Sequence, residues 1–238
     1  MVGRNLKLID AVAVLVWRVG RAPDPWAWID HQWAGNARWD DPFVSFRTIY
    51  AADSLFGCFV ELLAYARPDR TDDGGDLLSN IIEDPEDADE FPVPEAGAIE
   101  HTWIAGRMIG TANLSGRYVD VRDSATIAAL RPKYLTLALS LGFDDFDAAA
   151  LKAAYPRRLT HELTVDFNGM TRRDGSPSVD GVRFGSRHGD DLGMWAIYER
   201  PGDVPSSRLL SNRTASLVDE DDPDLQRAMD LHGLTWRR

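Results

Sequence analysis

The pattern of hydrophobic and polar positions is clearest from Ser54 to Ala66, where the chain reads SLFGCFVELLAYA. Apolar residues recur there with the period of an α-helix, and Asp53 or Ser54 supplies an N-cap. The apolar face gathers Leu55, Phe56, Phe59, Leu62, Leu63 and Ala66. The opposite face holds Glu61, the only charged residue of the segment, among small residues. The pattern predicts a helix whose lone carboxylate another group can approach closely.

A lone glutamate opposite an apolar stripe has two interpretations. Most such charges are simply the solvated side of a helix, because structural carboxylates outnumber catalytic ones. The preceding residues 46–52, FRTIYAA, are rich in β-branched and aromatic residues and predict a strand. Such a strand-to-helix unit can hold Tyr50 and Glu61 on rigid elements around one cleft, so Glu61 is the candidate catalytic carboxylate.

The other patterns predict strands and helices without a regular βαβ alternation. Strands are expected at 12–19, 103–116, 119–121, 181–184 and 194–198. Helices are expected at 124–130, 131–140 and 147–154. Five of the eight tryptophans lie in 17–39, which is expected to be mostly loop. This irregular mixture indicates an α+β fold in a single domain.

The charge is distributed unevenly along the chain. The 238 residues have a formal net charge of -12 and are 44% hydrophobic, which is typical of a globular protein with a substantial core. The segment at about 71–100 contains eleven acidic residues and no lysine or arginine. We expect it to be a long appendage beside the cleft that serves partner docking or access. The acidic balance does not favour nucleic acid, because phosphate binding needs clustered basic residues.

Several kinds of site are excluded or disfavoured. Cys58 is the only cysteine, so the chain forms no intramolecular disulfide and no cysteine-rich zinc site. The HExxH, GxxxxGK[ST], GxGxxG and GxSxG motifs are absent, and the five histidines are scattered, so we expect no metal site. No stretch reaches the roughly 18 apolar residues of a membrane span, and the apolar N-terminal segment lacks a signal-peptide cleavage site. The expectation is a cytoplasmic protein without a membrane anchor.

Four blocks of sequence, taken in order, resemble the RES domain. They are WRVGR (17–21), RWDDP (38–42), FRTIYAADSLFGCFVELLAYARP (46–68) and DGVRFGSRHGDDLGMWAIYER (180–200), with WIAGRMIGTANLSGRYVDV in the middle. That family is named for an arginine, a glutamate and a serine, and it resembles the toxin half of bacterial toxin–antitoxin pairs whose antitoxin is an Xre-type protein. The resemblance implies a catalytic domain over 1–205, with the acidic segment as an insertion, and a C-terminal extension over 206–238.

The resemblance also implies an ADP-ribosyltransferase-like fold and cleavage of the nicotinamide–ribose bond of NAD+, by hydrolysis or phosphorolysis. One carboxylate can suffice for that reaction, because the nicotinamide of NAD+ is already cationic and leaves without a proton. By resemblance, the catalytic residues are Arg18, Glu61 and Ser186, and the substrate contacts are Arg38 and Tyr50. NAD+ is then a substrate, and no cofactor is implied.

Two other functions stay open at this point. One is a protein ADP-ribosyltransferase, which breaks the same bond but passes ADP-ribose to a protein. The other is a non-catalytic binding module, whose contact surfaces are the tryptophan-rich region and the acidic segment. The expected partners are NAD+ and an Xre-type antitoxin, with a homo-oligomer also open.

Overall fold

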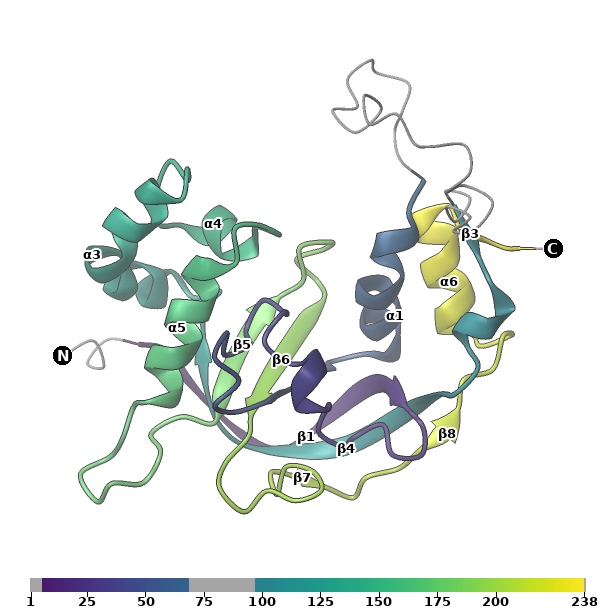
Figure 1. Cartoon of the computed structure of the whole chain (residues 1–238), viewed down its shortest axis with the longest axis horizontal. Helices are drawn as coiled ribbons and strands as arrows, with labels where there is room; N and C mark the ends of the chain where they lie inside the picture. The colour runs from purple at the N-terminus through teal and green to yellow at the C-terminus, as the bar shows by residue number, and fades with distance from the viewer. Residues whose placement is uncertain (1–5, 69–96, 238) are drawn as a thin grey trace.

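Two long strands form the base of the structure (Figure 1). In this computed structural model, which describes residues 6–68 and 97–237, β1 (Leu8–Arg21) pairs antiparallel with β4 (Arg107–Asp120) along almost its whole length. A bulge between Ala11 and Val14 interrupts the register. The predicted acidic insertion at about 71–100 lies outside the described residues, except for its last four.

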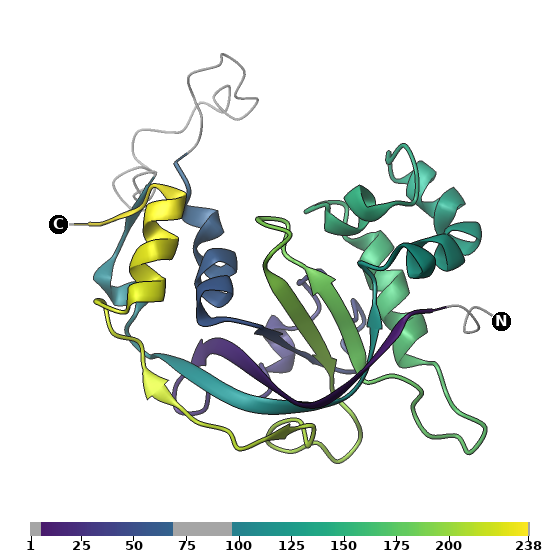
Figure 2. The same ribbon diagram turned by 180° about the vertical axis from the view of Figure 1, so that it is seen from behind.

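Shorter strands extend this pair into a sheet of seven strands. The other strands are β2 (Thr48–Ala52), β5 (Gly181–Gly185), β6 (Gly193–Tyr198), β7 (Leu210–Ser211) and β8 (Ser216–Leu217). The pairings run β1–β2–β6–β5–β4 and return to β1, so they close into a ring, with β7 and β8 attached to β4 outside it. Figure 2 shows β1 and β4 curving beneath the β5–β6 hairpin.

The helices stand in two groups on either side of the β5–β6 hairpin (Figures 1 and 2). One group contains α3 (Ser124–Ser140), α4 (Ala148–Lys152) and α5 (Arg158–Asn168). The other contains α1 (Leu55–Leu63), its extension η3 (Ala64–Ala66), and α6 (Pro223–His232). Short elements complete the fold: η2 (His31–Trp33), η4 (His101–Trp103), and the parallel pair β3 (Ala98–Ile99) and β9 (Thr235–Trp236).

The alternation along β2 divides the buried residues into two cores. Ile49 and Ala51 pack in a smaller cluster with Trp26 and Trp195, on one face of the sheet. Neighbouring residues point to the other face, as a strand requires, so Tyr50 packs against the larger cluster. That larger cluster joins the apolar sides of the helices and includes Phe59, Leu63, Leu130, Leu163, Phe167 and Leu225.

The α+β class is confirmed, with some corrections. The strands predicted at 103–116 and 119–121 form the single strand β4, whose glycines break the hydrophobic pattern. The two predicted helices at 124–130 and 131–140 form the single helix α3, which continues through Pro132 although proline usually marks a boundary. The sequence patterns did not predict α5, α6 or the strands of 206–238. Ser54, not Asp53, is the N-cap of α1, since its Oγ accepts the N–H of Gly57 at 3.1 Å.

The buried face of α1 is also broader than predicted. Cys58 and Val60 are fully packed, whereas Phe56 and Leu62 are only half-buried. The reason is that α1 packs against β1 and β2 on one side and against α6 on another. Little of α1 is therefore exposed to solvent. The role of Glu61 depends on the groups that surround its carboxylate.

Candidate functional site

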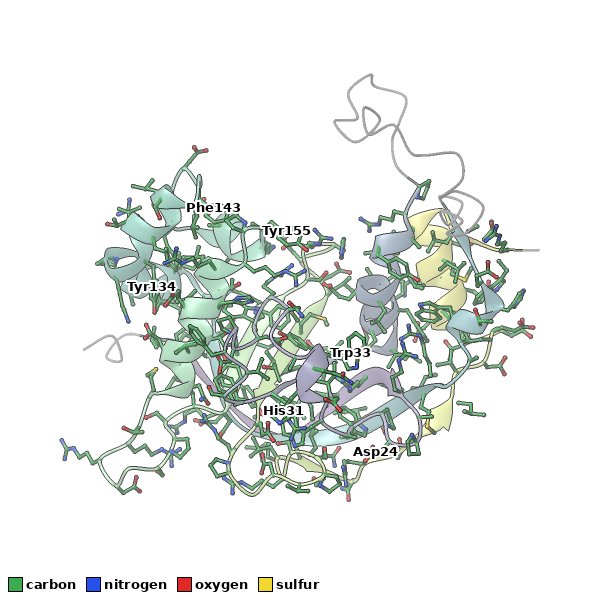
Figure 3. The ribbon with its side chains drawn as sticks, in the orientation of Figure 1. Asp24, His31, Trp33, Tyr134, Phe143 and Tyr155 are labelled. Carbon is green, nitrogen blue, oxygen red and sulfur yellow. The ribbon has the colours of Figure 1, made fainter. Side chains whose placement is uncertain are left out.

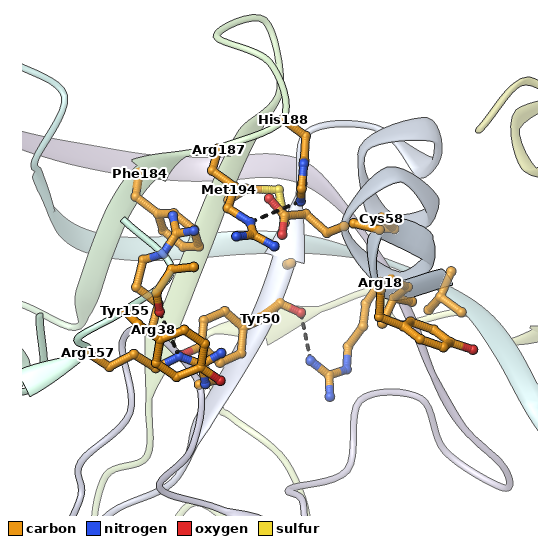
Figure 4. Close-up of a pocket in the computed structure, with 18 residues that line it drawn as sticks. Arg18, Arg38, Tyr50, Cys58, Tyr155, Arg157, Phe184, Arg187, His188 and Met194 are labelled. Carbon is orange, nitrogen blue, oxygen red and sulfur yellow. Dashed lines mark hydrogen bonds between the residues drawn. The ribbon is translucent and has the colours of Figure 1, made fainter. Parts of the chain in front are cut away.

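A cavity of about 540 Å³ lies beside α1, lined also by residues of the β5–β6 hairpin and of the loop before β2 (Figure 4). This volume is in the range of cavities that hold small-molecule ligands. Its charged lining consists of Arg18, Arg38, Arg157, Arg187 and Glu61, with the imidazole of His188 among them. Tyr50 also lines the cavity, so the structure brings together four of the five predicted site residues.

Glu61 is half-buried on α1 and lines the cavity. Its Oε1 atom is out of contact with solvent and has no hydrogen-bond partner in the part of the chain that the structure describes. Burial lowers the pKa of Arg38 and of His188, and the negative charge of Glu61 partly opposes that lowering, so Glu61 acts on both groups at close range. A buried carboxylate oxygen without a partner is costly, and a purely structural role for Glu61 does not account for it.

Arg18, on β1, is bound to the backbone on two sides. Its Nε donates to the carbonyl of Pro25 and its Nη1 to the carbonyl of Tyr50, both at 2.7 Å. The Pro25 loop comes this close because residue 20 is glycine: a Cβ there would lie 2.5 Å from the carbonyl oxygen of Pro25. Burial lowers the pKa of Arg18. The two hydrogen bonds of Arg18 hold the Pro25 loop and β2 to β1, and its positive charge also faces the cavity.

The loop that carries Arg38 is folded around the carboxylate of Asp40. Its Oδ2 accepts the N–H groups of Gly35 and Ala37, at 3.1 and 2.9 Å. Its Oδ1 accepts the hydroxyl of Tyr50 at 2.8 Å, and that hydroxyl accepts the N–H of Trp39 at 2.9 Å. The RWDDP block thus forms a rigid loop around Arg38.

The guanidinium of Arg38 lies over the ring of Phe184, 5.9 Å from its centroid. It donates no hydrogen bond to any residue in 6–68 or 97–237. Burial lowers the pKa of Arg38, and the attraction of Glu61 opposes that effect. Arg187 and Arg157 lower it further through repulsion between like charges. Arg38 is therefore a preorganised cation with its N–H donors unused.

Tyr50 has its hydroxyl committed to the Arg38 loop. Burial raises the pKa of Tyr50 well above its usual value, and the charge of Asp40 raises it further, so the hydroxyl stays protonated. The ring meets Phe184 edge to face, with centroids 6.2 Å apart. The ring of Tyr50 is the part of the side chain that a ligand can contact. Its stacking on nicotinamide stays a prediction.

Ser186 is placed differently from the other predicted residues. It is buried at the start of the turn between β5 and β6 and does not line the cavity. Its Oγ accepts the N–H of His188, and its own N–H donates to Leu192, both at 2.9 Å. This geometry shapes the turn that presents Arg187 and His188, and it does not bring the Ser186 hydroxyl to the cavity.

A pair of histidines beside Glu61 was not predicted from the sequence. The His188 ring lies edge to face with His232, with centroids 6.0 Å apart. Burial lowers the pKa of His188 to about 4, so its imidazole is neutral at pH 7. Its Nε2 accepts the Nε–H of Arg187 at 3.2 Å. The SRHG run was visible in the sequence, but nothing in it indicates a contact with α6.

The start of α1 is fixed to the hairpin by Asp53. Its Oδ1 accepts the indole Nε1–H of Trp195 at 2.8 Å, and its Oδ2 is paired with Arg183. The backbone N–H of Asp53 donates to Gly193 at 3.0 Å. One turn further along α1, the buried thiol of Cys58 donates to the carbonyl of Trp17 at 3.2 Å. Glu61 thus stands on a helix that is anchored to both β6 and β1.

The comparisons with known proteins do not show which family this chain belongs to. No family model and no curated protein matches this sequence. Among solved structures, a chain of the crystal structure of the M. tuberculosis MbcT–MbcA toxin–antitoxin complex is similar over 94% of this chain and 91% of its own, with 15% identity and a TM-score of 0.42. That likeness is too remote to support an argument. No helix in the described ranges is long and apolar enough to cross a membrane, and no group of His, Cys, Asp and Glu there is arranged to hold a metal ion.

Proposed function

We propose that this protein is an enzyme that cleaves the nicotinamide–ribose bond of NAD+, with Glu61 as its catalytic carboxylate. The observation that carries the proposal is the Oε1 of Glu61, which has no hydrogen-bond partner among the described residues and stands in a cavity whose other charged groups are arginines. No cation in residues 6–68 or 97–237 is bonded to that oxygen, so the carboxylate can stabilise positive charge on a ligand.

The chemistry requires a single carboxylate. When the C–N bond breaks, its electron pair returns to the nicotinamide nitrogen, which becomes neutral, and the ribose carbon becomes an oxocarbenium-like cation. Glu61 stabilises that cation. Attack by water then gives ADP-ribose and a proton, whereas attack by phosphate gives ADP-ribose that carries a phosphate on the same ribose carbon. Because the neighbouring His188 is neutral at pH 7, it does not compensate the charge of Glu61.

The rest of the cavity suits the remainder of the substrate. Arg18 and Arg38 present guanidinium groups, which bind phosphate oxygens through charge-assisted hydrogen bonds. The rings of Tyr50 and Phe184 offer apolar faces for the nicotinamide. The resemblance of the four sequence blocks to RES toxins extends the proposal to a role as an NAD+-depleting toxin held in check by an Xre-type antitoxin.

The test is nicotinamide release from NAD+ by the purified protein, with and without phosphate. We expect release by the wild type and a rate about 10²–10³ lower for Glu61→Gln, the usual effect of losing one preorganised electrostatic group. Glu162→Gln is the matched control, because Glu162 is exposed on α5 and pairs only with Arg158. Absence of release by the wild type would overturn the proposal, and transfer of labelled ADP-ribose to protein would favour the ADP-ribosyltransferase alternative.

A further inference from the structure

Three arginines from distant parts of the sequence gather at one end of the cavity. Arg38 comes from the loop before β2, Arg157 is the N-cap residue of α5, and Arg187 lies in the β5–β6 turn. Figure 4 shows Arg38 and Arg157 on one side of the cavity, Arg187 nearer His188 and Met194, and Arg18 on the other side, near α1. Burial lowers the pKa of Arg38, and the positive charges of Arg187 and Arg157 lower it further, so both of these arginines lie close enough to act on Arg38.

Nine of the 20 arginines in the described residues pair with an aspartate or a glutamate, and these three are not among them. Arg47, Arg117, Arg122, Arg131 and Arg183 each pair with an aspartate or glutamate. No carboxylate oxygen in the described part of the chain lies within 4.0 Å of the guanidinium nitrogens of Arg38, Arg157 or Arg187.

Few of their hydrogen-bond donors are used within the part of the chain that the structure describes. Each guanidinium has five N–H donors. Arg157 donates one bond to the carbonyl of Ala154 at 3.3 Å, and Arg187 donates one to His188. Among the described residues that line the cavity, Glu61 is the only carboxylate and it stands with four arginines, so the excess of positive charge points to a negative ligand.

A phosphate group is the anion that this arrangement fits best. Planar guanidinium groups bind phosphate oxygens through paired, parallel hydrogen bonds. Beside the cluster, the ring of Tyr155 is 73% exposed and lies 4.9 Å from the guanidinium of Arg157. Tyr155 stands on the segment between α4 and α5 (Figure 3) and lines the cavity, where its face can stack on a base. An anion site next to an exposed aromatic ring is the pattern of a nucleotide site.

We propose that Arg38, Arg157 and Arg187 form a phosphate subsite for a nucleotide ligand, with Tyr155 beside it as a stacking surface for the base. The nucleotide part of this inference rests on the proposed function, whereas the phosphate part rests on the arginine cluster. The phosphate belongs either to the internal diphosphate of a dinucleotide or to a terminal monoester such as a ribose 2′-phosphate. Both sources present the same group to the arginines.

The experiment is calorimetric titration with ADP-ribose, which contains no nicotinamide bond to cleave. We expect Arg157→Ala to weaken binding at least about tenfold, and Arg187→Ala to weaken it less, because Arg187 is exposed and its charge is screened. Arg158→Ala is the matched control, because Arg158 is the next residue, is exposed, and pairs with Glu162 outside the cavity. It should bind within about twofold of the wild type.

A second titration, with ADP-ribose 2′-phosphate, identifies the source of the phosphate. Equal weakening of both ligands by Arg157→Ala assigns the subsite to the diphosphate, and greater weakening of the 2′-phosphate form assigns it to the monoester. No binding of either ligand by the wild type, or no difference between Arg157→Ala and Arg158→Ala, overturns the subsite. Because binding is measured without turnover, a protein that binds ADP-ribose through these arginines but releases no nicotinamide would retain the subsite and lose the proposed function.

Discussion

The imidazole of His232 donates a hydrogen bond from Nε2 to the carbonyl oxygen of Val60, 2.8 Å away. Val60 precedes Glu61 in α1, so the C-terminal helix α6 holds the turn that carries the candidate catalytic carboxylate. The other ring nitrogen, Nδ1, accepts the Nε–H of Arg67 at 2.7 Å. These two bonds require a neutral imidazole, and burial lowers the pKa of His232 accordingly.

Replacing His232 tests this connection. We expect His232→Leu to lower the free energy of unfolding by about 1–3 kcal/mol, because it leaves the buried carbonyl of Val60 without its donor. Nicotinamide release should fall as well, since the turn that bears Glu61 loses its support. Urea unfolding and the release assay measure the two effects. Leu231→Ala, at an exposed position of the same helix, should change stability by no more than about 0.5 kcal/mol. Equal stability of the two variants would refute the link.

Glu61→Gln should separate activity from stability. The substitution removes a partly buried charge whose Oε1 has no partner among the described residues, so the free energy of unfolding should stay the same or rise. Activity, in contrast, should fall as proposed above. Thermal melting of Glu61→Gln beside the wild type checks this, and a clearly lower melting temperature would mean that Glu61 has a structural role.

The two predicted arginines should behave differently from each other. Arg18→Ala removes donors from the carbonyls of Pro25 and Tyr50 and should lower the free energy of unfolding by about 1.5–3 kcal/mol. Arg38→Ala breaks no hydrogen bond within the described residues, so it should weaken substrate binding with little change in stability. Chemical denaturation and the KM for NAD+ distinguish the two effects. A strongly destabilised Arg38→Ala would contradict the assignment of Arg38 to the ligand.

The histidine pair makes the protein sensitive to acid. The pKa of His188 is about 4 in the fold, against roughly 6.5 in an unfolded chain, because burial and the positive charges of Arg67, Arg187 and His232 outweigh the attraction of Glu61. The unfolded chain therefore binds a proton near pH 6.5 that the folded protein does not take up until about pH 4. Stability from this group is fully present above pH 6.5 and is lost as the pH falls towards 4.

The measurement is the melting temperature of the wild type and of His188→Gln between pH 7.5 and 4.5. The wild type should lose more stability than the variant over this range, since the variant lacks the titrating imidazole. The lowered pKa of His232, which both proteins keep, acts in the same direction. Parallel curves for the two proteins would show that His188 does not contribute.

The sequence predicted the parts of the site that follow a local pattern. The segment around Glu61 is a helix, β2 precedes it, and Tyr50 and Glu61 line the same cavity, because period and capping are encoded in adjacent residues. The RWDDP block was noted, but its internal bonding from Asp40 to the loop was not predicted.

The missed features depend on contacts between distant residues. Arg157 reaches the cavity only because α5 begins there, and the arginine pair 157–158 gives no sign of which member faces a cavity. His232 was missed because the tail after residue 200 contains no motif, and its role exists only once α6 packs on α1. The resemblance assigned Ser186 to catalysis, and the structure shows its Oγ accepting the N–H of His188 within the turn, so its catalytic role stays a prediction.

The single thiol of this protein, that of Cys58, can be used to measure how often α1 moves in solution. Cys58 lies on the same helix as Glu61, and burial raises its pKa to about 12, so almost no thiolate exists at neutral pH. Alkylating reagents react with the thiolate, so modification requires that α1 move enough to expose Cys58, which is buried beside the cavity. The rate at which iodoacetamide modifies Cys58 therefore reports how often this helix opens, and a ligand that closes the cavity should slow that modification without any introduced probe.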